Sequence, residues 1–179
     1  MTMINTTDYS RALYELAQET GAEDTILEEM KTVCHIFAEN PAYVALLDTP
    51  AVAKAQRLSL LDESFSTLSP YHLNFLKILC EKQGTRQYPA CAGGYEDLYD
   101  QAHGILRATA ITAVKMSQAQ VETLTKKLQT MTGKTVQLQN NVDPEILGGV
   151  TLRFGGVQLD GSLQSRLEEL RQSLKRAIV

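Results

Sequence analysis

Apolar residues recur at every third or fourth position through the first 104 residues, which is the spacing of one face of an α-helix. Prolines and glycines interrupt this pattern, because proline cannot continue a helix and glycine readily ends one. The pattern therefore predicts six amphipathic helices in this part of the chain. They lie at residues 8–17, 26–37, 43–47, 51–65, 70–83 and 88–102.

The period changes after Gly104, where apolar and polar residues begin to alternate and β-branched residues become frequent. Alternation predicts strands, and a return to the helical period after the first of them predicts a helix. The resulting order is strand, helix, strand, strand, strand, helix. These elements lie at residues 105–114, 118–132, 134–142, 150–154, 157–159 and 163–178.

Gly155 and Gly156 stand between two short apolar runs. Such a pair predicts a tight β-hairpin turn, because these turns need positive φ angles that glycine adopts without strain. Asp160, Gly161 and Ser162 then end the strand and offer an N-cap for a last helix. The apolar residues of that helix follow at steps of three and four. They are Leu163, Leu167, Leu170, Leu174 and Ile178.

Together these elements predict an α+β protein with two domains. Residues 1–104 form an N-terminal six-helix bundle, and residues 105–179 form a small C-terminal α/β domain with a β-hairpin and a terminal helix. The first segment holds fifteen acidic and seven basic residues, a net charge of −8, whereas the second holds six acidic and ten basic residues, a net charge of +4. This asymmetry suggests two domains that face different partners. Two independently solvated surfaces would give the same pattern.

The sixth predicted helix contains Gly93 and Gly94 in its interior. A glycine inside a helix costs about 1 kcal/mol relative to alanine. We therefore expect either a close approach of another helix or a bend at this pair.

Composition narrows the class of protein further. No run of about 18 apolar residues is present, so no transmembrane helix is expected. The first ten residues lack a basic segment followed by an apolar one, so we expect neither a secretory signal nor a transit peptide. Cys34, Cys80 and Cys91 are odd in number and widely spaced, which favours reduced, mostly buried thiols.

Candidate chemistry is sparse along the chain. His35, His72 and His103 stand in no metal-ligand spacing, and we interpret them as surface or partly buried helical residues. No phosphate-binding loop is present, and Ser162 has the surroundings of a capping residue rather than a nucleophile. The adjacent carboxylates of Glu28 and Glu29 point about 100° apart on a helix, so they indicate a solvated face rather than an acid–base pair. We therefore predict no catalytic residue, no metal site and no cofactor.

An RNA-associated helical adaptor is the alternative function. The basic C-terminal half favours it, since small α/β sheets can stack bases on aromatic side chains. The predicted strands offer only Phe154 for stacking, where two or three aromatic residues are typical. We therefore predict no nucleic-acid partner.

Two of the predicted helices carry more apolar surface than a small bundle needs. The first helix has Tyr9, Ala12, Leu13 and Leu16, and the fifth has apolar residues on several sides around Asn74. One buried face per helix is enough for a bundle. The surplus either belongs to the core or forms a groove for a third, incoming helix.

Three segments, in this order and spacing, resemble the delta subunit of bacterial F-type ATP synthases, whose mitochondrial relative is the oligomycin-sensitivity-conferring protein. Residues 8–17 (DYSRALYELA) resemble the opening helix of this family, and residues 74–82 (NFLKILCEK) resemble its fifth helix. The most specific segment is residues 147–174, which contains the Gly148-Gly149-Val150 and Asp160-Gly161-Ser162 motifs. The resemblance covers essentially the whole chain.

The resemblance implies a non-catalytic stator in the peripheral stalk, which links the catalytic head to the membrane sector during proton-driven ATP synthesis. It implies that the N-terminal domain binds the N-terminal helix of an alpha subunit and that the C-terminal domain binds the b subunits. The first and fifth helices would form the groove for the alpha-subunit helix. The implied partner-binding residues are Tyr9, Ala12, Leu13, Leu16, Asn74, Ile78 and Glu81.

The same resemblance implies a location. The protein would lie at the cytoplasmic face of the bacterial cell membrane, as a peripheral protein that associates with the membrane only through the complex.

Overall fold

A computed structural model describes residues 5–144, 148–154 and 157–161. The chain divides into two compact units, residues 1–99 and 100–179. This boundary lies slightly before Gly104, the boundary that the sequence predicts. Asp100 belongs to the second unit, where its carboxylate accepts two hydrogen bonds of 2.6 and 2.9 Å from the Arg107 guanidinium.

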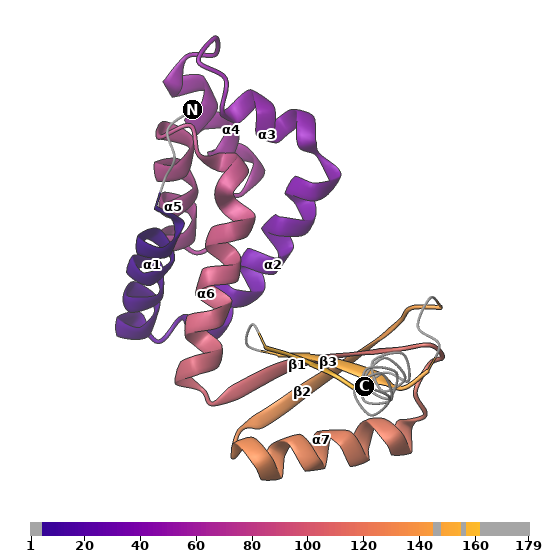
Figure 1. Cartoon of the computed structure of the whole chain (residues 1–179). Coiled ribbons are helices and arrows are strands. Elements are labelled where there is room, and N and C mark those ends of the chain that lie inside the picture. Colours follow the sequence, from indigo (N-terminus) through magenta and orange to yellow (C-terminus); the bar gives the residue numbers. More distant parts are fainter. Residues whose placement is uncertain (1–4, 145–147, 155–156, 162–179) are drawn as a thin grey trace, which may run out of the picture. The chain divides into compact units, whose positions relative to one another are not determined.

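The first unit consists of helices, and every helix predicted there is present (Figure 1). A short 3₁₀-helix, η1, was not predicted; its first two backbone N–H groups donate to the carboxylate of Asp48. The elements are α1 (Thr6–Thr20), α2 (Glu23–Glu39), α3 (Pro41–Leu47), α4 (Lys54–Ser64), α5 (Pro70–Glu81), η1 (Thr85–Gln87) and α6 (Tyr88–Ala102).

Glycine and proline set the helix ends where the sequence places them. Gly21 ends α1 in the left-handed conformation, with φ 66°, and its N–H caps the carbonyls of the last turn. Pro41 and Pro70 stand in the first turns of α3 and α5. Proline is tolerated there because the N–H groups of a first turn have no partner within the helix.

The core of the first unit is large and mostly aliphatic, and several aromatic rings in it contact one another. Phe37 meets Tyr88 edge to face with ring centroids 5.2 Å apart, and it meets Phe65 edge to face at 5.9 Å. The helix predicted at residues 26–37 lies within α2, and four of its apolar residues at helical spacing are buried. They are Ile26, Met30, Val33 and Phe37.

Gly94 marks a close approach between α1 and α6. A Cβ atom built on Gly94 would lie 2.7 Å from the Ser10 hydroxyl oxygen. That hydroxyl donates to the backbone carbonyl of Cys91 at 2.8 Å, so it cannot move away freely. The predicted close approach is confirmed at Gly94, whereas Gly93 faces open space.

The described part of the second unit is a four-stranded sheet with one helix. The strand order is β2-β1-β3-β4, with β1 and β2 parallel and the other pairs antiparallel. The antiparallel pairing of β3 with β4 agrees with the predicted hairpin. The turn glycines and the predicted terminal helix lie outside the described residues. The elements are β1 (Ile105–Thr112), α7 (Gln118–Thr132), β2 (Thr135–Val142), β3 (Val150–Phe154) and β4 (Val157–Asp160).

β1 is shorter than the strand predicted at residues 105–114. It ends at Thr112, where the chain bends and the Thr112 hydroxyl donates to the Val114 carbonyl at 2.8 Å. The helix after it is confirmed in detail: Ser117 caps α7 in a capping box, and Gly133 ends it with φ 68°.

One face of this sheet is apolar, and α7 lies along it (Figure 1). The register places Ala108 beside Phe154 and Ala110 beside Leu152 on the same face. α7 packs over β2, at one edge of the sheet. The core between them is small. Its fully buried members are Ala108, Leu128 and Val136.

Candidate partner-binding surfaces

The first candidate surface lies on α1 and α5, which pack side by side (Figure 1). Tyr9 of α1 meets Phe75 of α5 edge to face, with ring centroids 6.5 Å apart. Phe75 is buried and Tyr9 is half buried. The contact therefore leaves part of the Tyr9 side chain open to solvent.

The residues predicted to bind a partner differ in exposure. Ala12, Asn74, Ile78 and Glu81 are exposed, whereas Tyr9 and Leu16 are half buried. Asn74, Ile78 and Glu81 follow the spacing i, i+4, i+7, which places them on one face of α5. Leu13 is only 3% exposed and packs in the core of the first unit. The structure thus places six of the seven residues at least partly in contact with solvent.

The opposite side of α5 is fixed by a buried polar network around His72. Its Nδ1 lies 2.9 Å from a carboxylate oxygen of Glu29 in α2, and its Nε2 lies 2.8 Å from the Tyr88 hydroxyl in α6. The same carboxylate accepts hydrogen bonds of 2.7 and 2.8 Å from the Ser69 backbone N–H and hydroxyl. The network ties the N-terminal end of α5 to α2 and α6.

The interpretation of His72 as a surface or partly buried residue was wrong, since its side chain is completely buried. Glu29, predicted on a solvated face, is only 15% exposed. One signal was available: His72 stands three and seven positions before Phe75 and Leu79, on their core-facing side of the helix. Burial lowers the pKa of His72, and the Glu29 carboxylate partly opposes that shift. At a pH above 6.5 a neutral imidazole that donates from Nδ1 to Glu29 and accepts at Nε2 from the Tyr88 hydroxyl satisfies both contacts.

The C-terminal end of α5 is fixed by Arg57 of α4. The Arg57 guanidinium is buried and donates to the carbonyl of Leu47 at 2.7 Å and to that of Cys80 at 3.1 Å. Carbonyls at helix ends lack partners within the helix, so a buried arginine there satisfies both α3 and α5. The helical pattern of the sequence did not identify this residue, because arginine usually lies at the surface.

The three cysteines are free thiols, with Cys80 and Cys91 buried and Cys34 half buried. Burial raises the pKa of Cys91 to about 11 and also raises that of Cys80. Since the thiolate is the reactive form, both side chains act as small packing groups.

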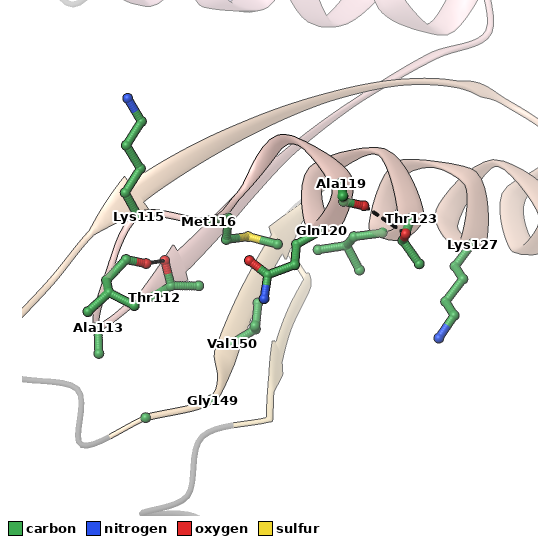
Figure 2. A pocket seen from close by; sticks show the side chains of 13 residues that line it. Thr112, Ala113, Lys115, Met116, Ala119, Gln120, Thr123, Lys127, Gly149 and Val150 are labelled. Atoms are coloured by element: carbon green, nitrogen blue, oxygen red, sulfur yellow. Dashed lines mark hydrogen bonds between the residues drawn. The ribbon is translucent and has the colours of Figure 1, made fainter.

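The second candidate surface is a cleft of about 530 Å³ at one end of the sheet in the second unit (Figure 2). The end of β1, the first turns of α7 and the start of β3 surround it. Gly148 and Gly149 contribute bare backbone to one wall, with φ angles of 142° and 94° that side-chain-bearing residues rarely adopt. Met116, Gln120 and Val150 converge in the cleft, whereas Lys127 extends outward at its rim.

Within the described residues, no group of three or more histidine, cysteine, aspartate or glutamate side chains is placed to hold a metal ion. In the same part of the chain, no helix combines the length and apolar character that crossing a membrane requires.

Sequence relatives cover almost the whole chain. Residues 6–174 match the family model of the ATP synthase delta (OSCP) subunit. ATP synthase subunit delta of Lactobacillus johnsonii is 32% identical over 167 residues, which cover 93% of this chain and 92% of that relative. ATP synthase subunit delta of Clostridioides difficile is 30% identical over 172 residues, covering 95% of each chain. That of Syntrophomonas wolfei is 33% identical over 172 residues, covering 94% and 93%.

The fold is also similar to that of a solved chain. A chain in the cryo-EM structure of the Toxoplasma gondii mitochondrial ATP synthase hexamer matches with a TM-score of 0.75 at 19% identity, and the match covers 96% of this chain and 98% of that chain. The alternative prediction of an RNA-associated adaptor gains no support from these comparisons. The chain belongs to the ATP synthase delta (OSCP) subunit family, and it is a structural subunit of the peripheral stalk of an F-type ATP synthase.

Proposed function

We propose that this protein connects two parts of the synthase through two separate surfaces. The first unit, as a six-helix bundle, binds the N-terminal helix of an alpha subunit along α1 and α5. The second unit binds the C-terminal ends of the b subunits. The protein thereby resists the torque that rotation exerts on the catalytic head, at the cytoplasmic face of the membrane.

The surface of α1 and α5 supports the first contact. Ile78 is 38% exposed although it lies on a helix whose other aliphatic residues are mostly buried. The exposed methyl of Ala12 leaves room above α1, and the amide of Asn74 can bond to a polar group on an incoming helix. An amphipathic helix recognises such a surface through apolar side chains spaced three and four residues apart.

The fixed inner side of α5 supports the same proposal. His72 and Arg57 hold the two ends of α5 against its neighbours, so the outer face is held in one position before a partner arrives. A surface that is already ordered loses little conformational entropy on binding. Low entropic cost favours the tight, slowly dissociating interface that a stator needs, because affinity is tuned mainly through the dissociation rate.

Substitution of Ala12 by tryptophan tests this contact. The indole should occupy the space that the alpha-subunit helix needs, and we expect the affinity for the N-terminal peptide of the alpha subunit to fall about 30-fold, or about 2 kcal/mol. Isothermal titration calorimetry measures the affinity, and circular dichroism verifies the fold. Ala42→Trp, at an exposed position on α3, is the matched control. Unchanged affinity in a folded Ala12→Trp protein would refute the proposed surface.

The division of partners between the units is tested by capture from solubilised membranes. We expect the full chain to retain both alpha and b subunits. Ala12→Trp should bind the alpha-subunit peptide more weakly, as above, and should bind isolated b subunits as tightly as the wild type does. Loss of both partners in this folded variant would contradict separate surfaces.

A further inference from the structure

The first unit contains a cavity of about 380 Å³ that lies apart from the surface of α1 and α5. Its walls come from the last turns of α2, the first turns of α3, η1 and the first turn of α6. None of the described residues that line it belongs to α1 or α5. Its volume falls within the range of about 300–1,000 Å³ that is typical of small-molecule sites.

Most of the surface inside this cavity is apolar. Phe37 and Val44 line it and are buried, so they form its floor. Its mouth has three exposed apolar residues, which are Ala38, Pro41 and Pro89. The cavity therefore opens to solvent, and an apolar group that enters it leaves water for an apolar surrounding, which is favourable.

Arg86 supplies the charge at this cavity, and no acidic residue is among the described residues that line it. Its side chain is 56% exposed, and its Nε lies 3.9 Å from a carboxylate oxygen of Asp48, which is too far for a hydrogen bond. That carboxylate already accepts hydrogen bonds from the backbone N–H groups of Thr85 and Arg86. The guanidinium therefore keeps donors for a ligand, and its planar fork matches a carboxylate.

A buried hydroxyl beside Arg86 lacks a partner. Thr85 lines the cavity and is 1% exposed, and its hydroxyl oxygen forms no hydrogen bond within the part of the chain that the structure describes. Buried polar atoms are nearly always paired, so an unpaired one next to a cavity needs an explanation. A polar atom on a ligand in the cavity would supply the missing partner.

We propose that this cavity binds a small amphiphile with one carboxylate, of the class of medium-chain fatty acids. Its apolar chain packs on Phe37 and Val44, and its carboxylate accepts hydrogen bonds from Arg86 and the Thr85 hydroxyl. One guanidinium matches a ligand with one negative charge, whereas a phosphate group carries nearly two. The site uses neither surface of the proposed function, so the inference does not depend on that function.

Decanoate is the probe, and the reactivity of Cys34 in the full-length protein reports its binding. Cys34 lines the cavity and is half buried, whereas Cys80 and Cys91 are 1% and 0% exposed. Saturating decanoate should slow the alkylation of Cys34 by iodoacetamide at least about fivefold, because it covers the thiol. Decanol lacks the charge, so it should need an at least about tenfold higher concentration for the same protection. Mass spectrometry measures each rate, and unchanged protection of the two buried cysteines verifies the fold.

The charge is tested by Arg86→Gln. This variant should bind decanoate about tenfold more weakly and should no longer prefer decanoate to decanol. Lys82→Gln is the matched control, because it makes the same charge change at an exposed position that does not line the cavity. It should bind decanoate like the wild type.

The hydroxyl is tested by Thr85→Val, which keeps the shape of the side chain. Its affinity for decanoate should fall about threefold, because one hydrogen bond to the carboxylate is lost. The free protein should be no less stable, since this hydroxyl has no described partner to lose. Unchanged affinity for decanoate would overturn the assignment of Thr85.

The location is tested by Ala38→Trp, whose indole should fill the mouth of the cavity. Decanoate should then change the alkylation rate of Cys34 by less than about twofold. Ala42→Trp, at an exposed position that does not line the cavity, is the control and should keep the full protection.

Three outcomes would overturn the inference. The first is an alkylation rate of Cys34 that decanoate does not change in the wild type. The second is equal protection by decanoate in Arg86→Gln and Lys82→Gln, which would exclude recognition of the carboxylate. The third is protection of Cys34 on assembly into the synthase without protection by decanoate, which would make another subunit the occupant. Failure of the alpha-subunit peptide to bind would count against the proposed function and leave this site unaffected.

Discussion

The two compact units bury their apolar residues to different extents. In the described residues, the core of the first unit contains nineteen buried apolar residues from six helices. The core of the second contains three, with Leu152 and Phe154 only partly buried beside them. A domain is stable when apolar burial exceeds the entropy lost on folding, and that excess shrinks as the core shrinks. We therefore expect the first unit to be stable by itself, and the second to depend more on what covers its sheet.

The largest effect that we predict concerns the two parts in isolation. Residues 1–104 should fold alone and melt in one cooperative transition, because the whole large core lies within this fragment. Residues 105–179 should show a weak or absent transition. The fragment 1–104 loses the Arg107 partner of Asp100, at the end of α6, and the hydrogen bond from the Thr135 N–H to the Gly104 carbonyl. Circular dichroism during thermal unfolding distinguishes the two fragments. A fragment 1–104 without helical signal would show that the first unit does not fold by itself, which contradicts the prediction.

Truncation of a core leucine in each unit sharpens the comparison. Leu76 is completely buried in the first unit, and Leu76→Ala should lower its free energy of unfolding by about 3–4 kcal/mol. Leu128→Ala should cost about 2 kcal/mol, because the neighbours of Leu128 are partly exposed and can close around the smaller side chain. Urea unfolding of the full chain measures both values. Equal costs would show that the second core is as closely packed as the first.

The sequence predicted the helices of the first unit because each contains a local periodic pattern, and most of these patterns end near a proline or glycine. It also predicted the strands and the helix of the second unit up to β4, since alternation is equally local, but the parallel pairing of β1 with β2 comes from the structure. It did not predict the burial of His72, Glu29 and Arg57. Their partners lie 10 to 43 positions away along the chain, so no local pattern records the contact. The surplus apolar surface of α1 was visible, but only the structure assigns Leu13 to the core.

The neighbouring glycines of α6 should respond in opposite directions to alanine. Gly93→Ala should stabilise the first unit by about 0.5–1 kcal/mol, because alanine favours the helix and the site faces open space. Gly94→Ala should destabilise it by about 1 kcal/mol, because the new methyl group meets the Ser10 hydroxyl and overpacks the contact between α1 and α6. Chemical unfolding measures both. Combination with Ser10→Ala should recover part of the loss at Gly94, and no recovery would contradict the steric explanation.

The smallest effect that we predict is a pH dependence confined to the first unit. Burial lowers the pKa of His72 below its ordinary value of 6.5, despite the opposing Glu29 carboxylate. Between the lowered pKa and 6.5, the unfolded chain binds more protons than the folded one, so stability rises with pH through this window. The contribution is fully present above pH 6.5 and is lost as the pH falls toward the lowered value. Urea unfolding of the first unit at a series of pH values measures this slope.

His72→Gln isolates the histidine in that measurement. Glutamine keeps a polar group of similar reach between Glu29 and Tyr88, and it does not titrate. The variant should be less stable at neutral pH, and it should lose the part of the slope that His72 contributes. Leu76→Ala is the control, because it lowers the stability of the same unit and leaves the histidine network in place. A slope that survives in His72→Gln would assign the pH dependence to other groups, and a slope lost in Leu76→Ala would assign it to core packing.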